Sequence, residues 1–250
     1  MFRYGVIDSL VNFKFRQIST TANAVLIMGE QGSGKSTLLS FLNCTYRQLG
    51  YKTLSNYPME NCFQIPLIER DNKDGSVTKI VNKQWLYNSN LRHCAIFIDE
   101  AADIWNARKF GNWTFADGNF FTKLRKNDII LVLVTQYYDL IDINCKRACK
   151  QTWFLTQHNL FKNVSFVRVS SLLTAPISDN TKTIAIKGKY AVSPINYDLC
   201  EDFIGNFRFY RKPYYKYFIT EFDFSTKIDV KWDSIPTWNC LFDIPEAVYN

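Results

Sequence analysis

Residues 24–36 read Ala-Val-Leu-Ile-Met-Gly-Glu-Gln-Gly-Ser-Gly-Lys-Ser, and this stretch decides the fold. It contains the pattern G-x-x-x-x-G-K-S, with Gly29, Gly34, Lys35 and Ser36 at its fixed positions. A short apolar run precedes the pattern, and a helix-like run follows it as far as residue 48. A strand, a glycine-rich loop and a helix in this order are typical of a phosphate-binding loop. We therefore predict a nucleotide site here, against the alternative of an ordinary glycine turn.

The chemistry of this loop suits ATP, because a triphosphate needs many hydrogen-bond donors in a small space. Glycines let the backbone curl so that its N–H groups and the following helix terminus face the phosphates. We expect Lys35 to reach the β- and γ-phosphates and Ser36 to bind Mg²⁺, while the acidic Glu30 points away from the phosphates. The residues predicted to bind the nucleotide are Gly29, Glu30, Gln31, Gly32, Ser33, Gly34, Lys35, Ser36 and Thr37.

A pair of adjacent carboxylates supplies the second half of the predicted site. The apolar run over residues 94–98 predicts a strand buried on both faces, and it ends in Asp99 and Glu100. Carboxylates at the end of a buried strand are costly unless something uses them. We expect Asp99 to bind Mg²⁺ and Glu100 to act as the general base that activates water. The alternative is a pair of residues that caps the next helical stretch.

A third apolar run, residues 129–134, ends in Thr135 and Gln136. Doubly wound sheets place their ligands at the carboxyl ends of the strands. We therefore predict that Gln136 senses the γ-phosphate and the attacking water. The alternative is a polar residue that only ends the strand.

Length and composition bound the classes of protein that remain. The chain has 250 residues, enough for one large α/β domain or for a core with an appendage. Its formal net charge of +7 suits a polyanionic partner such as DNA or RNA. The seven cysteines show no metal-ligand or disulfide framework, so we expect free thiols in a reducing cytoplasm. No apolar run is long enough to span a membrane, which predicts a soluble chain.

The pattern of the chain changes after the first 156 residues. Residues 1–156 read as a P-loop ATPase core with a central, mainly parallel sheet flanked by helices, and residues 152–156 are expected to form its edge strand. Residues 157–250 read as a small β-rich extension packed on the core, because residues 164–169, 183–187 and 208–218 show strand-like alternation. The basic and aromatic residues 210–216 are predicted to be a strand with one exposed face, with a DNA or capsid platform as the alternative.

Residues 24–156 resemble the FtsK–HerA superfamily of P-loop ATPases, and within it the viral genome-packaging ATPases and the zonula-occludens-toxin-like assembly ATPases of filamentous phages. The motifs that carry this resemblance are I-F-I-D-E-A from Ile96, F-F-T-K-L-R-K-N-D-I-I-L-V-L-V-T-Q from Phe120, and I-D-I-N-C-K-R-A-C-K-Q-T-W from Ile141. The run Ser55-Asn56-Tyr57-Pro58 also resembles the second strand and its exit turn.

The resemblance implies a pentameric or hexameric ring that moves DNA, the viral genome, by hydrolysing ATP at subunit interfaces. Such a ring needs an arginine supplied across the interface, and Arg125 and Arg147 match arginines of the family pattern. Which of the two acts in trans stays open, and surface solvation is the alternative for both. The resemblance also implies a capsid or vertex protein as a partner, and a location in the host cytoplasm or with the virion.

We predict that DNA contacts the loop that follows Asp99 and Glu100, the acid pair. Basic residues there would hold phosphates, and an aromatic residue could stack on nucleotides. The alternative is a solvated loop whose tryptophan packs on its own domain. The predicted DNA contacts are Arg108, Lys109, Trp113, Lys123 and Lys126.

Several functions remain open from the sequence alone. An ATP-driven DNA translocase is the first hypothesis. An assembly ATPase that acts on coat proteins at a membrane is the second, and the absence of a membrane span from this chain separates it from the usual filamentous-phage relatives. A small-molecule kinase and a non-catalytic nucleotide-gated module are weaker readings, since no arginine-rich lid is found and Glu100 argues for hydrolysis.

Overall fold

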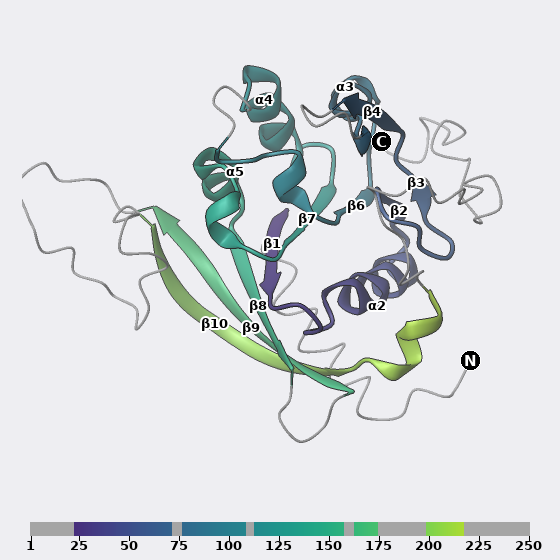
Figure 1. Cartoon of the computed structure of the whole chain (residues 1–250), viewed down its shortest axis with the longest axis vertical. Coiled ribbons are helices and arrows are strands. Elements are labelled where there is room, and N and C mark those ends of the chain that lie inside the picture. The colour runs from purple at the N-terminus through teal and green to yellow at the C-terminus, as the bar shows by residue number, and fades with distance from the viewer. Residues whose placement is uncertain (1–22, 72–76, 109–112, 158–162, 175–198, 218–250) are drawn as a thin grey trace, which may run out of the picture.

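The computed structural model describes residues 23–71, 77–108, 113–157, 163–174 and 199–217. Its centre is one large sheet whose strands come from both halves of the chain (Figure 1). The strands are β1 (Ala24–Gly29), β2 (Lys52–Ser55), β3 (Phe63–Gln64), β6 (Cys94–Ile98), β7 (Ile129–Thr135), β8 (Gln151–Gln157), β9 (Val164–Thr174) and β10 (Leu199–Tyr210). Their spatial order is β10-β9-β8-β1-β7-β6-β2-β3.

The six strands from β8 to β3 run parallel. Every residue of β6 and of β7 is buried, because helices cover both faces of this part of the sheet. β7 lies between β1 and β6, so the carboxyl end of β7 emerges between the phosphate loop and the acid pair. The chain therefore has the predicted α/β fold of a P-loop NTPase.

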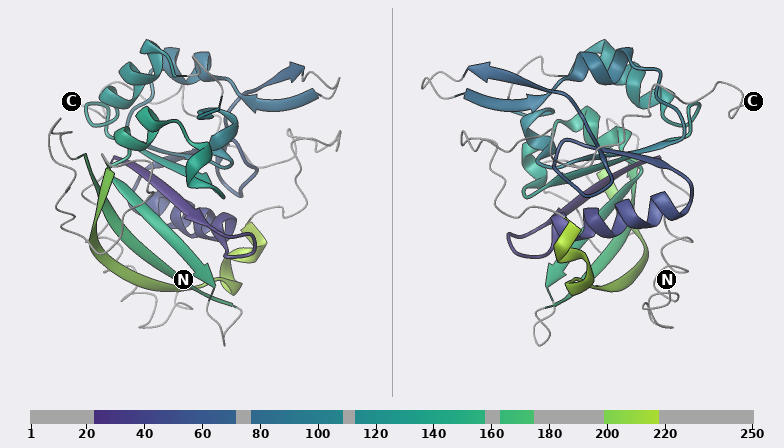
Figure 2. Two further views of the ribbon diagram at one scale, coloured as in Figure 1. Left: turned by 60° about the vertical axis from the view of Figure 1, so that its left-hand side comes forward. Right: turned by 90° about the vertical axis from the view of Figure 1, so that its right-hand side faces the viewer.

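Helices form one layer on each side of the sheet (Figure 1). On one side, α2 (Lys35–Gln48) packs with apolar residues of β1 and with the inner faces of β9 and β10. On the other side lie α3 (Lys83–Asn88), α4 (Phe115–Lys123) and α5 (Ile143–Ala148), whose apolar residues join a second core cluster. A hairpin of β4 (Leu67–Asp71) and β5 (Val77–Val81) projects from the body of the molecule (Figure 2).

The prediction that residues 152–156 form an edge strand is wrong. β8 pairs parallel with β1 on one side and antiparallel with β9 on the other, and β10 follows as the next strand. Val167, Val169, Phe207 and Phe209 are buried in the core. The neighbours of the two phenylalanines along β10, Asn206, Arg208 and Tyr210, are exposed, which is the alternation that predicts a strand with one buried face. The described part of the β-rich segment therefore continues the central sheet.

The expected strand over residues 208–218 ends early. β10 stops at Tyr210, and a 3₁₀ helix, η3 (Lys212–Tyr217), follows it. Pro213 has no N–H to give to a sheet ladder, which accounts for the end of the strand. The predicted strand over residues 183–187 lies outside the described residues. Among the described residues, no helix has the length and apolarity that a membrane span requires.

Candidate nucleotide site

The phosphate loop is a tight turn between β1 and α2. The backbone N–H of Ser33 donates to the carbonyl of Glu30 across the turn, with an N···O distance of 3.1 Å. Gly32 and Gly34 have φ angles of 78° and 98°, and a side chain would strain the backbone at either position. The first helical hydrogen bond, from Leu38 N–H to the Gly34 carbonyl at 2.9 Å, starts α2 immediately after the turn. Glu30 and Gln31 are exposed at the tip.

Gly29 is required for a different reason. A Cβ atom at Gly29 would lie 2.6 Å from the carbonyl oxygen of Leu155 and 2.7 Å from Ser33 Oγ. The first of these neighbours belongs to β8, the strand that pairs with β1. A side chain at Gly29 would therefore push the phosphate loop away from the adjacent strand.

Lys35 is folded back over the loop. Its Nζ donates to the carbonyls of Gly29 and Glu30 at 2.8 and 3.0 Å, so the ammonium group lies across the mouth of the turn. Burial lowers the pKa of Lys35, and the nearby carboxylates of Asp99 and Glu100 oppose that shift. Because the carbonyls hold the ammonium group in place, it is ready to meet a phosphate that enters the loop.

Asp99 follows the carboxyl end of β6 and is fixed by Asn56 and by the backbone of Glu100. Its backbone N–H donates to Asn56 Oδ1 at 2.7 Å, and Asn56 Nδ2 donates to its carbonyl at 2.9 Å. Its carboxylate accepts a hydrogen bond from the backbone N–H of Glu100 at 3.1 Å, and the nearby Ser36 side chain helps to lower its pKa. The two residues predicted to bind Mg²⁺, Ser36 and Asp99, therefore lie near one another.

The local electrostatics favour a cation between these two residues. Burial, and then the charge of Glu100, raise the pKa of Asp99 to about 6, despite the hydrogen bonds and the charge of Lys35 that lower it. A further positive charge nearby would stabilise the ionised form of this buried carboxylate. A hydroxyl and a carboxylate are oxygen donors of the kind that Mg²⁺ prefers. These residues therefore fit a magnesium ion.

Glu100 is held toward Gln136 in a strained backbone conformation. Its φ of 50° and ψ of 52° lie in the left-handed region, which costs a residue with a side chain on the order of 1–2 kcal/mol. The Glu100 side chain makes no capping hydrogen bond to the short helix that follows, so the capping alternative does not describe it. Instead, Gln136 Nε2 donates to Glu100 Oε1 at 2.9 Å.

The strand that carries Gln136 is arranged to present it. Thr135, the last residue of β7, is buried. Its hydroxyl accepts a hydrogen bond from the N–H of Tyr137 and donates one to the carbonyl of the same residue, which forms a turn. This turn leaves Gln136 exposed between the ends of β1 and β6. The phosphate loop, Asp99, Glu100 and Gln136, which the sequence predicts to form one site, thus all lie at the carboxyl edge of the parallel sheet.

Arg125 and Arg147 are not part of this cluster. Arg125 is exposed and precedes the amino end of β7, about 20 Å of strand away from Gln136. Arg147 is exposed near the end of α5, three residues before Lys150, whose N–H bonds the carbonyl of Ala24 at the amino end of β1. Both arginines therefore lie toward the opposite edge of the sheet from their own nucleotide site.

The predicted DNA contacts are divided between the two edges. Arg108 is exposed on the loop after β6, at the carboxyl edge, whereas Lys123 and Lys126 are exposed at the amino edge. Trp113 is half-buried and packs on Phe121 with a ring-centroid distance of 5.3 Å, as the alternative for this tryptophan proposed. Lys109 lies outside the described residues.

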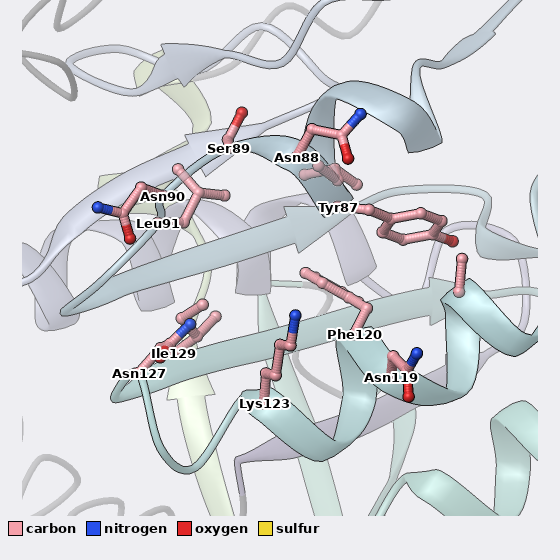
Figure 3. A pocket seen from close by; sticks show the side chains of 12 residues that line it. Tyr87, Asn88, Ser89, Asn90, Leu91, Asn119, Phe120, Lys123, Asn127 and Ile129 are labelled. Atoms are coloured by element: carbon pink, nitrogen blue, oxygen red, sulfur yellow. The ribbon is translucent and has the colours of Figure 1, made fainter.

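Lys123 also lines a separate cavity of about 400 Å³ (Figure 3). Residues of the α3 end and of α4 surround it, together with the amino end of β7. Four of the lining side chains are asparagines, Asn88, Asn90, Asn119 and Asn127. None of the nucleotide-site residues lines this cavity, so it is distinct from the site described above.

Three residues at the site are not identified by the sequence analysis. Asn56 clamps the main chain of Asp99, and only its position at the exit of a predicted strand hinted at this. Ser165 donates its hydroxyl to the carbonyl of Ser33 at 2.6 Å, and Arg211 donates to the carbonyl of Gly32 at 2.8 Å. Both come from the β-rich segment, and no spacing in the sequence connects them to the phosphate loop.

Comparison with known proteins gives structural neighbours only. No protein-family model matches the sequence, and no curated protein is significantly similar to it. The N-terminal domain of zonular occludens toxin from Neisseria meningitidis has 16% identity and a TM-score of 0.47, covering 80% of this chain and 100% of that domain. The genome packaging NTPase B204 from Sulfolobus turreted icosahedral virus 2 has 14% identity and a TM-score of 0.44, covering 58% and 91%.

These neighbours are the two kinds of protein that the sequence resemblance names. Flagellar accessory protein FlaH from Methanocaldococcus jannaschii is also similar, with 12% identity and a TM-score of 0.36 over 59% of this chain and 78% of that one. Since these TM-scores are below 0.5, the fold assignment rests on the strand order and the phosphate loop rather than on the neighbours.

Proposed function

We propose that this chain hydrolyses ATP and that an oligomeric ring of it moves DNA, as a viral genome-packaging ATPase does. One observation carries the hydrolysis: Gln136 Nε2 donates to Glu100 Oε1 at 2.9 Å, which joins the acid pair to the end of the third strand beside the phosphate loop. An N-cap pair or a simple glycine turn would have no need of this arrangement.

Each residue of the site has its own role in the proposed hydrolysis. The loop amides and Lys35 bind the β- and γ-phosphates and offset their charge. Ser36 and Asp99 would hold Mg²⁺, which neutralises phosphate charge when bound. Glu100 accepts a proton from a water as the water oxygen attacks the γ-phosphorus, and the bond from phosphorus to the β-phosphate oxygen breaks to leave ADP and inorganic phosphate. Gln136, bonded to Glu100, orients that water.

A neighbouring subunit completes the site in this proposal. An arginine can stabilise the charge on the transferring phosphate group, and the two arginines that match the family pattern, Arg125 and Arg147, lie toward the amino edge, away from the Gln136 of their own chain. Arg125 is exposed there among other basic side chains, so it is available to a second copy. We assign the trans role to Arg125 because the motif that contains it leads directly into β7.

The loop after β6 offers a path from hydrolysis to DNA. Main-chain hydrogen bonds tie this loop to the segment after β7: Ala107 N–H donates to the Leu140 carbonyl and Asp142 N–H to the Trp105 carbonyl, both at 2.8 Å. A change at Gln136 would thus be passed to the residues beside Arg108. Of the predicted DNA contacts, this arrangement favours Arg108 over the lysines at the amino edge.

The test is the ATPase rate of the purified full chain with no nucleic acid, with single-stranded DNA and with double-stranded DNA, alongside the oligomer mass. We expect a magnesium-dependent rate that DNA increases, and a mass of several subunits. Hydrolysis that ignores both DNAs would overturn the translocase and favour an assembly ATPase acting on coat proteins. A chain that does not bind ATP would overturn the nucleotide site itself.

A further inference from the structure

An arginine from beyond β10 touches the phosphate loop. The Arg211 guanidinium donates to the carbonyl oxygen of Gly32 with an N···O distance of 2.8 Å. Its stem covers Gly34: a Cβ atom built there would lie 2.5 Å from Arg211 Cδ and 3.2 Å from a terminal nitrogen. The segment that carries it lies beside the loop between β1 and α2 in both views of Figure 2. Arg211 is 179 positions away from Gly32 in the chain.

The environment of Arg211 is unfavourable for stability alone. The residue is only 6% exposed, and its Nε–H is buried without a hydrogen-bond partner. Among the described residues, no carboxylate forms an ion pair with it. Arginine stays protonated in proteins, and a buried charge with an unsatisfied donor destabilises a fold. A buried cation of this kind is favourable beside a site that receives an anion.

The surrounding contacts fix Arg211 in place. Its N–H donates to the carbonyl of Asn163 at 2.8 Å, just before β9. The next turn of chain is held on α2, where Tyr214 meets Phe41 edge to face at 5.3 Å between ring centroids. Arg211 is therefore anchored both to the β9–β10 pair and to the helix that begins at the phosphate loop.

Ser165 makes a second contact of the same kind. This fully buried residue of β9 donates its hydroxyl to the Ser33 carbonyl at 2.6 Å. The carbonyl and N–H of a trans peptide point in opposite directions, so this bond turns the Gly34 N–H to the other side of the loop. Two consecutive carbonyls of the phosphate loop are thus held by residues of the β-rich segment.

We propose that Arg211 is a positioning residue for nucleotide binding, which it promotes by fixing the phosphate loop through Gly32 and by adding, beside the triphosphate, a positive charge that no described carboxylate pairs with. Ser165 assists by fixing the next carbonyl. The proposal rests on the assignment of the loop as an ATP site. It gives the β9–β10 pair a role in that site, since the pair sets the shape of the loop.

The experiment compares the affinity of Arg211→Met, Arg211→Lys and Ser165→Ala variants for ATP with Mg²⁺, in the full chain, by titration calorimetry. Arg211→Met keeps the apolar stem and removes charge and donors, so we expect affinity to fall about tenfold to a hundredfold. Arg211→Lys keeps the charge and should fall less, and Ser165→Ala should fall about threefold to tenfold. Lys212→Met is the matched control, because Lys212 is the next residue and is exposed.

Two further readouts separate positioning from simple stability. In the Arg211→Met variant we expect KM for ATP to rise while kcat at saturation changes little, and the melting temperature without nucleotide to stay near that of Lys212→Met. Unchanged affinity in the Arg211 variants would overturn the proposal, as would a drop in melting temperature that alone accounts for the loss. If Arg211→Met does not fold, unchanged affinity in Ser165→Ala and Arg211→Lys overturns it. Failure of the unmodified chain to bind ATP would instead overturn the proposed function.

Discussion

Glu100 is the residue at which binding and hydrolysis should separate most cleanly. Glu100→Gln keeps the size of the side chain and its ability to bond Gln136 but cannot accept a proton. We expect the hydrolysis rate to fall about 100-fold to 10,000-fold while the affinity for ATP is retained. Single-turnover hydrolysis and equilibrium titration on the same preparation measure the two quantities. Full turnover in this variant would remove Glu100 from the mechanism.

Asp99 should make the nucleotide-free chain less stable as the pH rises. Burial raises its folded-state pKa to about 6, above the value of about 4 expected in the unfolded chain. The folded state therefore binds more protons, and the associated stability is lost as the pH rises from about 4 to about 6. Asp99→Asn removes this ionisation, so we expect it to raise the free energy of unfolding at pH 7 by on the order of 1–3 kcal/mol.

Urea denaturation of the nucleotide-free chain at pH 4 and pH 7 tests this. The gain from Asp99→Asn should be present at pH 7 and small at pH 4, and the variant should lose its magnesium-dependent affinity for ATP. Asp139→Asn is the control, because Asp139 is exposed near the same edge of the sheet. An equal effect of both substitutions at both pH values would contradict the assignment.

At the residue scale, the sequence could predict the parts of the site that are local in the chain. The spacing from Gly29 to Ser36 needs no tertiary information, and the acid pair follows directly from a buried strand. Asn56, Ser165 and Arg211 could not be predicted in the same way. Their contacts depend on which strands become neighbours, and no local pattern encodes that.

The loop after β6 and the start of α4 are held together by one buried carboxylate, Asp117. It accepts hydrogen bonds from Trp105 Nε1 at 2.6 Å, from the N–H and hydroxyl of Thr114 and from the Tyr87 hydroxyl, and it pairs with Lys83 at 2.8 Å. Burial alone would raise its pKa, but these partners outweigh burial and lower the pKa to about 2. The loop that carries Arg108 thus depends on Asp117.

Asp117→Ala should therefore destabilise this element strongly. The substitution leaves several buried donors without an acceptor, and we expect a loss of about 2–4 kcal/mol in the free energy of unfolding at pH 7. The folded-state pKa is below the unfolded value, so the contribution is present above about pH 4 and is lost as the pH falls toward 2. Asn119→Ala, exposed on the same helix, is the control in urea denaturation. A loss in Asp117→Ala no larger than in this control would contradict the role of Asp117.

At the scale of helices and strands, the sequence predicts an element where it contains an apolar run or a helix cap. The runs at β1, β6 and β7 predicted buried parallel strands. Thr114 and Asp117 form the capping box that begins α4, and this signal is present in the sequence itself. The sequence predicts an edge strand at β8 and not the observed pairing with β9, because the residues of one strand do not reveal whether another strand pairs with its far side.

At the scale of the whole molecule, the predicted DNA contacts at the carboxyl edge of the sheet can be compared with those at the amino edge. We expect Arg108→Ala to reduce the DNA stimulation of ATPase activity more than Lys126→Ala does, because the Arg108 loop is bonded to the segment after Gln136. Each lost phosphate contact should also lower the salt dependence of DNA binding by about one in the log–log slope. Equal loss in both variants would place DNA on both edges, and loss only in Lys126→Ala would move it to the amino edge.

The amino edge of the sheet has a charge distribution that suits a neighbouring subunit. Among the described residues, six exposed basic side chains lie there, against one exposed carboxylate, Asp128. The six are Arg92, Lys123, Arg125, Lys126, Arg147 and Lys150. The carboxyl edge of the next copy would present phosphates and the acid pair, so a head-to-tail contact joins opposite charges.

A mixing experiment tests this contact and the trans role of Arg125 together. Lys35→Ala and Arg125→Ala should each abolish most ATPase activity, because one lacks its phosphate ligand and the other its contribution to the neighbour. In an equal mixture, an interface with Lys35 from one copy and Arg125 from the next is complete, which random assembly gives at about one interface in four. We therefore expect activity to reappear on mixing. A mixture of Lys35→Ala and Glu100→Gln, which damages the same side of the interface twice, should stay inactive. If the first mixture also stays inactive while both variants assemble, Arg125 does not act across the interface.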